Sequence, residues 1–172
     1  MSKKTTLNCL SAILFIFLYS TSFATSTKWE RNTLKGLKKL FVVVQTLRQG
    51  DVEIGIPEEK IKEEIEFELT SRGFEVLDST KAKRIGNVLG VTVSILRSDT
   101  LIDKSLDVYI YTVDLVIRQK IILRRNRFIH SSAITWYAAE TGICKLRNLD
   151  LELSQSLKRM MDKFFIDYYK VN

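Results

Sequence analysis

The feature that most constrains the fold is a run of alternating side chains over residues 107–125, DVYIYTVDLVIRQKIILRR. The odd-numbered positions from Tyr109 to Leu123 are apolar except for Gln119, whereas charged side chains stand at even-numbered positions: Asp114, Arg118, Lys120 and Arg124. A period of two with one apolar face is typical of a strand whose sheet is covered on one side only. We therefore expect an antiparallel sheet with helices on one face.

Four further segments have strand patterns. The β-branched run 37–47, LKKLFVVVQTL, predicts a buried strand, and the short stretch 74–77, FEVL, predicts another. Residues 87–97 alternate, with four apolar side chains on one face: Leu89, Val91, Val93 and Ile95. Asn126-Arg127 looks like a hairpin turn, after which residues 128–140 return beside the long strand until Gly142 breaks the pattern.

Two segments have the pattern of amphipathic helices. Pro57 suits a first helical position, two glutamates follow it, and Gly73 ends this helix as a left-handed cap. Its apolar face repeats every four residues: Ile61, Ile65 and Leu69. We expect Asn148 to cap a second, C-terminal helix. This helix has a long apolar stripe: Leu149, Leu153, Leu157, Met160, Met161, Phe164 and Tyr168.

The resulting element order is β-α-β-β-β-β-α. Because the strands are clustered rather than alternating with helices, this order predicts the α+β class. We expect a single, mostly antiparallel sheet of about five strands with two helices packed on one face. Residues 37–172 would form one domain, which 45% hydrophobic residues are enough to fill, and residues 25–36 a loose leader.

The N-terminus has the pattern of an export signal. Lys3 and Lys4 precede an apolar run over 10–19, which is shorter than the about 20 residues that span a bilayer. The run ends in Ser22-Phe23-Ala24, which resembles a signal-peptidase site. We predict a signal peptide over 1–24 with cleavage before Thr25, and a periplasmic or secreted protein without a transmembrane span. An uncleaved anchor is the alternative.

Charge and cysteine content restrict the partners. Loss of Lys3 and Lys4 lowers the 27 basic residues to 25, against 20 acidic ones, so the exported chain stays basic. This charge permits contact with anionic lipid, lipopolysaccharide or an envelope protein, while export argues against nucleic acid. Cys144 is then the one remaining cysteine, which excludes an intramolecular disulfide and leaves burial or intermolecular pairing open. The oligomeric state stays open as well.

The strongest candidate site is the basic hairpin. It carries five cations: Arg118, Lys120, Arg124, Arg125 and Arg127. Arginine suits bidentate phosphate binding, so the hairpin is a candidate for binding anionic surfaces. The alternative is that the charges protect a strand from aggregation. Trp136 is a candidate aromatic contact for a ligand, with core packing as the alternative.

Catalytic and metal patterns are sparse. His130 and Cys144 form the single nucleophile pair that the chain permits, and no third, orienting group follows from the pattern. A zinc site needs about four ligands, typically Cys and His, and these two residues are too few. The chain contains no phosphate-binding loop, no G-x-G-x-x-G, no G-x-S-x-G and no H-E-x-x-H. We predict neither a metal nor a cofactor.

Several stretches together resemble a family of small exported bacterial proteins of unassigned function. They are GIPEEKIKEEIEFEL with GFEVL, VYIYTVDLVIRQ with LRR, SAITW with Gly142, and the C-terminal MDKFFIDYYKVN. The most specific parts are the Thr135-Trp136 pair and the C-terminal Asp-Lys-Phe helix. The resemblance implies one α+β domain behind a signal peptide, with no catalytic or metal residues. The layout is also similar, by analogy, to small periplasmic modules of envelope assembly proteins.

These observations predict a non-enzymatic, exported, envelope-associated binding or interaction module. Two alternatives stay open. One is a small envelope hydrolase that uses Cys144 and His130, and the other is a structural subunit that pairs through a sheet edge or the C-terminal helix.

Overall fold

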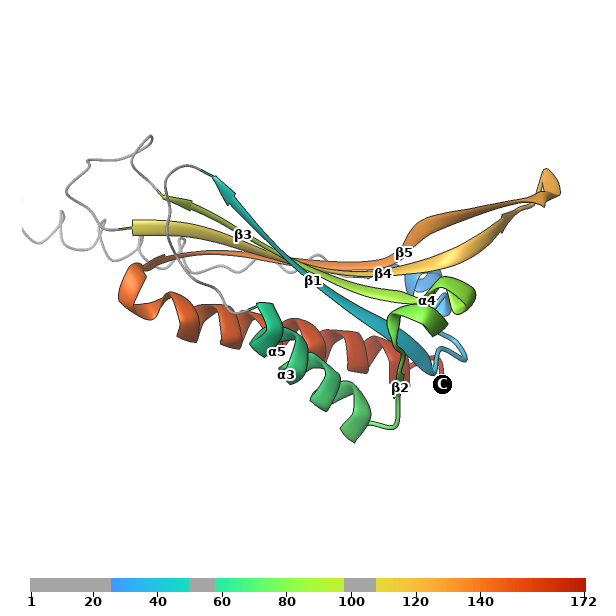
Figure 1. The fold of residues 1–172 in the computed structure, drawn as a ribbon, viewed down its shortest axis with the longest axis horizontal. Helices are drawn as coiled ribbons and strands as arrows, with labels where there is room; N and C mark the ends of the chain where they lie inside the picture. Colours follow the sequence, from blue (N-terminus) through green and yellow to red (C-terminus); the bar gives the residue numbers. More distant parts are fainter. Residues whose placement is uncertain (1–25, 50–57, 98–107) are drawn as a thin grey trace, which may run out of the picture.

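The fold is built on a five-stranded sheet. The computed structural model describes residues 26–49, 58–97 and 108–172 of the chain. The strand order in the sheet is β2-β1-β3-β4-β5 (Figure 1). The strands are β1 (Lys39–Gln49), β2 (Glu75–Val76), β3 (Val88–Arg97), β4 (Val108–Leu123) and β5 (Asn126–Lys145). The predicted α+β class with a five-stranded sheet is confirmed.

The sheet is mixed, which corrects the expectation that it would be mostly antiparallel. β1 runs parallel to both β2 and β3, whereas β3, β4 and β5 pair antiparallel in sequence. A helix between two strands returns the chain to the end of the sheet where it started, and the next strand is then parallel. The helix that follows β1 makes this crossover, so the strand pattern alone did not reveal the direction of pairing.

Two long helices cover one face of the sheet, as predicted (Figure 1). They are α3 (Glu58–Ser71) and α5 (Leu149–Tyr169). Ile65 and Leu69 of α3 are buried, and the whole predicted stripe of α5 is buried with them. The four predicted β3 side chains and the odd-numbered β4 side chains from Tyr109 to Ile117 are buried too. All of these belong to one hydrophobic cluster.

Two short helices were not predicted. The first, α2 (Lys28–Asn32), replaces the expected loose leader: Thr27 and Glu30 cap it reciprocally, and Ser26 before it is buried. The second, α4 (Ser79–Ile85), follows β2 and is capped by the Asp78 side chain, which accepts a hydrogen bond from the Lys81 backbone N–H. Both helices are stabilised at their ends by polar caps, and neither has an extended apolar period that would reveal it.

The hairpin turn lies two residues earlier than predicted. Arg124-Arg125 form the turn between the paired residues Leu123 and Asn126, and Asn126-Arg127 already belong to β5. The side chain of Asn126 accepts a hydrogen bond of 3.0 Å from the backbone N–H of Phe128. An asparagine that bonds to its own backbone two residues on is a common turn signal, which explains the displaced prediction.

Gly142 does not break β5. It lies within the strand, paired with Tyr111, and an added Cβ would lie 2.3 Å from the Tyr111 ring and hydroxyl. The glycine therefore makes room for the tyrosine side chain. Gly73 does end α3 with a φ of 83°, as predicted, and Pro57 lies outside the described residues.

The start of α5 also differs from expectation. A 3-10 turn, η2 (Leu146–Asn148), leads into the helix, and the side chain of Asn148 makes no capping hydrogen bond. Two acidic residues in the first turn of the helix, Asp150 and Glu152, lie beside the positive end of the helix dipole.

Candidate functional site: the arm formed by β4 and β5

Beyond the helices, β4 and β5 continue as a two-stranded projection that we call the arm (residues 118–134). Figure 1 shows it extending past the ends of α3 and α5. Its strands pair from Arg118 with Ile134 to Ile122 with His130. None of its residues is buried. At its base, Arg118 still pairs with Val88 of β3, and Lys120 lies close to Gly86 at the end of α4. Further out, the arm is held by the pairing of its own two strands.

The base of the arm is a β-bulge at Thr135. Ile117 pairs with Trp136 and Arg118 pairs with Ile134, so Thr135 is an extra residue on β5. The hydroxyl of Thr33, at the end of α2, shares its one proton between the Glu30 carbonyl at 2.6 Å and the Thr135 carbonyl at 3.0 Å. The Thr135 hydroxyl in turn donates to Oε1 of Gln119 at 2.7 Å. Bulges bend a strand and increase its twist, so these contacts fix the direction in which the arm leaves the sheet.

Trp136, next to the bulge, is part of the core. Its side chain is 0% exposed, and its indole N–H donates a hydrogen bond of 3.1 Å to Oδ2 of Asp167. The ring meets Phe164 edge-on with 5.4 Å between ring centroids. The aromatic contact with a ligand that we considered at Trp136 is therefore wrong. The Thr135-Trp136 pair joins the arm to the core.

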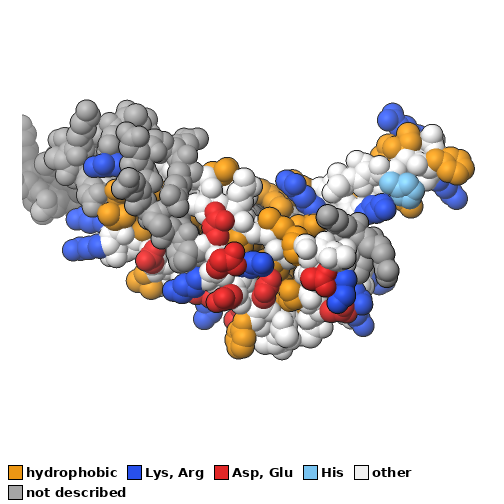
Figure 2. Space-filling model, in the orientation of Figure 1, with side chains coloured by type: hydrophobic (Ala, Val, Ile, Leu, Met, Phe, Trp, Pro, Cys, Tyr) orange, Lys and Arg blue, Asp and Glu red, His pale blue; other side chains and the backbone are white. Residues whose placement is uncertain are grey.

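The structure separates the five predicted cations into two groups. Arg118 and Lys120 alternate along β4 and share its face, as predicted. Arg124 does not share that face, because it lies with Arg125 in the turn, and Arg127 follows in β5. All five side chains are exposed. Figure 2 shows blue Lys and Arg side chains along the arm and at its end.

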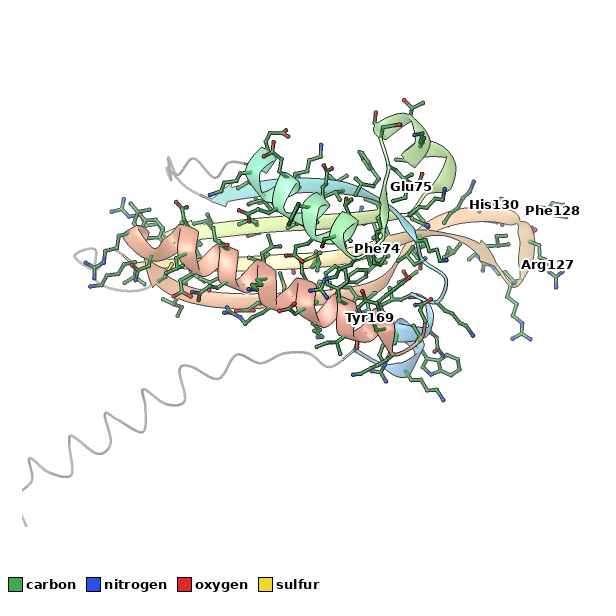
Figure 3. All side chains as sticks on the ribbon, turned by 90° about the horizontal axis from the view of Figure 1, so that it is seen from below. Phe74, Glu75, Arg127, Phe128, His130 and Tyr169 are labelled. Atoms are coloured by element: carbon green, nitrogen blue, oxygen red, sulfur yellow. The ribbon has the colours of Figure 1, made fainter. Side chains whose placement is uncertain are left out.

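The arm contains no acidic residue, and four of its large apolar side chains are exposed. Phe128 at the tip is 93% exposed, and Ile122, Ile129 and Ile134 are 58%, 43% and 53% exposed. Figure 3 shows Phe128 and Arg127 pointing away from the body at the far end of the arm. The cations were predicted from the sequence, but Phe128 was missed, because residues 128–140 have the pattern of an ordinary return strand. Exposed apolar side chains gathered in one place indicate a binding surface.

His130 and Cys144 do not meet. His130 pairs with Ile122 in the arm, whereas Cys144 pairs with Tyr109 at the opposite end of β4. Their separation along β5 is about 45 Å at the usual rise per residue. Burial, followed by the nearby Glu152 carboxylate, raises the pKa of the Cys144 thiol to about 11. At this separation, His130 and Cys144 of one chain do not form a dyad. A neutral, buried thiol is also a poor nucleophile.

Two buried carboxylates are engaged in structural contacts. Asp167 of α5 accepts hydrogen bonds from Ser26 and from Trp136. Glu140 of β5 pairs with Arg159 of α5, whose Nε donates to both carboxylate oxygens at 3.1 Å. This contact raises the pKa of the Arg159 guanidinium, which stays charged. Both carboxylates tie α5 to neighbouring elements and leave no free acid–base pair there.

A cleft runs between α3 and α5. It contains a hollow of about 260 Å³ and a smaller one of about 70 Å³, both lined by Glu64, Ser154 and Leu157. Acidic and basic side chains alternate on its rim, so it carries no single sign of charge: Lys60, Glu68, Arg72, Lys158 and Asp162. Among the described residues, no group of three or more His, Cys, Asp or Glu side chains is placed to hold a metal ion.

Comparison of the chain with protein-family models and with curated proteins finds no match. The resemblance to a family of small exported bacterial proteins therefore stays a prediction. In the part of the chain that the structure describes, no helix has the length and apolarity needed to cross a membrane.

Proposed function

We propose that the protein is a non-enzymatic binding module of the cell envelope that attaches to anionic surfaces through the arm. One observation carries the proposal. Five cations and no carboxylate lie within residues 118–134, on a projection none of whose residues is buried. The binding chemistry is recognition of phosphate groups, such as those of anionic lipid or lipopolysaccharide, by guanidinium and ammonium groups.

The physical basis is the unrelieved repulsion within the arm. Across the strand pair, Arg118 faces Ile134 and Lys120 faces Ser132, so neither cation has an acidic partner opposite. Each Lys or Arg near an anionic membrane contributes about 1 kcal/mol, and salt screens this attraction. Several such contacts together are enough for reversible attachment that depends on ionic strength.

The assignment to the envelope is part of the proposal, and the pattern over residues 1–24 supports it. Those residues lie outside the described part of the chain. N-terminal sequencing of the protein from a periplasmic fraction should return Thr25 as the first residue. Recovery of an intact Met1 from the inner membrane would contradict cleavage and favour the uncleaved anchor.

Co-sedimentation with vesicles tests the binding. We expect wild-type protein to sediment with vesicles that contain phosphatidylglycerol, and to stay in solution with phosphatidylcholine alone. Replacing Arg118, Lys120 and Arg124 together with Gln should abolish sedimentation. The matched control replaces three exposed lysines elsewhere, Lys28, Lys35 and Lys38, with Gln and should retain it. Equal loss in both triple variants, or no binding by the wild type at low salt, contradicts the proposal.

A second candidate function is that of a structural subunit, which the position of β5 favours. β5 is a strand of 20 residues at one edge of the sheet. Exposed edge strands readily pair with a second chain. Light scattering on the purified protein discriminates the two, because a stable monomer excludes a constitutive assembly through this edge.

A further inference from the structure

We propose that the tip of the arm, centred on Phe128, inserts into the boundary between headgroups and acyl chains of an anionic lipid bilayer. This inference rests on the proposed function and specifies its target. Of the surfaces that carry phosphates, it selects a bilayer rather than a soluble polyanion. The apolar side chains of the arm carry the inference, because attraction between charges alone does not require them.

Phe128 is the side chain that most favours a bilayer. It is 93% exposed, although it is among the largest apolar side chains of the chain. A soluble polyanion would engage the five cations and leave this ring in water. A lipid surface offers both partners, because its phosphates lie directly above hydrocarbon. Interfacial membrane segments combine basic and apolar side chains in this way.

Apolar side chains lie on both faces of the arm. Ile122 and Ile134 lie on the face that carries Arg118 and Lys120, since these residues alternate along the strands or pair across them. Ile121, paired with Ser131, lies on the opposite face. An arm lying flat would bury only one of these faces. A tip-first approach brings both faces into contact with the headgroup layer.

The tip itself combines cations with the phenyl ring. Arg124 and Arg125 form the turn, and Arg127 directly precedes Phe128. With the tip pointing at the bilayer, these guanidinium groups reach the phosphates while the phenyl ring enters the layer below. Figure 3 shows Arg127 and Phe128 together at the end of the projection, away from every helix that it draws.

The length and backbone of the arm limit the depth of insertion. Six residues of β4, from Arg118 to Leu123, give the arm a length of about 20 Å. Interfacial segments bury their apolar side chains about 5–10 Å deep. The backbone of the turn needs hydrogen-bond partners that hydrocarbon does not provide, so deeper entry is unfavourable. The tip therefore stops at the boundary, and the base of the arm stays in water.

The experiment places a reporter at the tip. Phe128→Trp is introduced together with Trp29→Phe, which removes an indole that is 82% exposed on α2. Trp136 stays as a fully buried internal reference. The matched control is Phe67→Trp in the same Trp29→Phe background, because Phe67 is also an exposed phenylalanine, at 72%, but lies on α3. Circular dichroism checks the fold of both variants.

Both variants are mixed with phosphatidylglycerol vesicles whose lipids carry bromine at defined acyl positions. We expect the emission of the Phe128→Trp variant to shift to the blue, and bromines near the headgroup to quench it more than deep ones. The Phe67→Trp control should show neither effect. In the wild-type background, Phe128→Ser should lower the vesicle partition coefficient about tenfold or more, as expected for one apolar ring withheld from the bilayer.

The outcomes separate the two proposals. Sedimentation with anionic vesicles but no quenching overturns insertion and leaves electrostatic attachment intact. Sedimentation without quenching, together with equal affinity for a soluble polyanion such as heparin, assigns the arm to polyanion binding instead. Failure to sediment overturns both proposals. Quenching of the Phe67→Trp control to the same extent means that the body, not the arm, enters the bilayer.

Discussion

The same two strands behave in opposite ways at their two ends. Over Trp136–Lys145, β5 lies under α5, and its inward side chains Trp136, Ala138, Glu140 and Cys144 are buried. Over 126–135, the same strand has no buried residue. Helix length accounts for the difference. The 21 residues of α5 extend about 31 Å, which covers about ten residues of strand rather than the 20 of β5.

Polar contacts differ between the two ends in the same way. In the body, Arg159 and the buried Glu140 form an ion pair, and Asp167 accepts hydrogen bonds from two other elements. In the arm, five cations share a projection that has no carboxylate. Buried carboxylates in the body are thus paired with donors from other elements, whereas the cations of the arm have no carboxylate within it. Removing equivalent groups from the two ends tests this contrast.

The largest difference is expected between two arginines. Arg159→Ala leaves Glu140, whose side chain is 3% exposed, without its counterion. We expect this change to lower the free energy of unfolding by about 3 kcal/mol, the lower end for a broken buried pair, because Arg159 itself is partly exposed. Arg118→Ala in the arm should change it by no more than about 0.5 kcal/mol. Urea denaturation of both variants measures the contrast, and similar losses would remove it.

The second contrast concerns two cysteines. Cys144 has a pKa raised to about 11, so its thiol stays protonated at pH 7.5, and the thiolate forms only as the pH approaches that value. We expect alkylation at least about 100-fold slower than for an unperturbed thiol with a pKa of about 8.5. A cysteine introduced at the exposed Ser131 of the arm should react at the unperturbed rate. Rapid modification of Cys144 would contradict the burial of its thiol.

The third contrast concerns added volume. Gly142→Ala places a methyl group 2.3 Å from the Tyr111 ring, so tyrosine or backbone must move. Overpacking of this kind costs about 1–3 kcal/mol. Ser132→Ala, in the exposed part of the same strand, should have almost no effect on thermal stability. If Gly142→Ala is also neutral, the Tyr111 side chain has room to rotate away, and close packing does not require glycine at this position.

The sequence predicted the body well because the side chains that are buried there recur at a regular spacing along each strand and helix. The alternation of β3 and β4 and the stripe of α5 each identify the face that is buried in the fold. The short helices α2 and α4 were missed because polar caps define them. The parallel pairing of β1 was missed although the helix between β1 and β2 was predicted, because the clustering of the later strands favours a mostly antiparallel sheet.

The candidate site was predicted in part. The cations were visible in the sequence, but the projection that carries them was not. Whether an alternating strand is covered depends on where α5 ends, at Tyr169, about 40 residues beyond Phe128. Strand periodicity carries no information about that. Phe128 was missed for this reason, because residues 128–140 have the pattern of an ordinary return strand.

A smaller effect is expected at the junction between the two regions. Thr33→Val removes the hydroxyl that bonds to the Thr135 carbonyl at the bulge. One such hydrogen bond contributes about 1 kcal/mol. We expect faster amide hydrogen exchange in the arm, with little change in β3. Thr141→Val, which removes a threonine pair with Thr112 on the open face, is the control and should leave exchange in the arm unchanged.

The smallest expected effect is also the one that tests the role of charge most directly. Arg118 and Lys120 share one face and have no acidic residue across the strand pair, and Arg124 adds a third cation at the turn, so replacing all three with Gln removes repulsion. At low salt we expect the triple variant to be as stable as the wild type or more stable, by up to about 0.5 kcal/mol. At 1 M salt, where screening acts within about 3 Å, the difference should vanish. Urea denaturation at the two salt concentrations measures both values.

A loss of more than about 1 kcal/mol in the free energy of unfolding at low salt would show that the cations stabilise the body. Their assignment to an external anionic surface would then lose its basis.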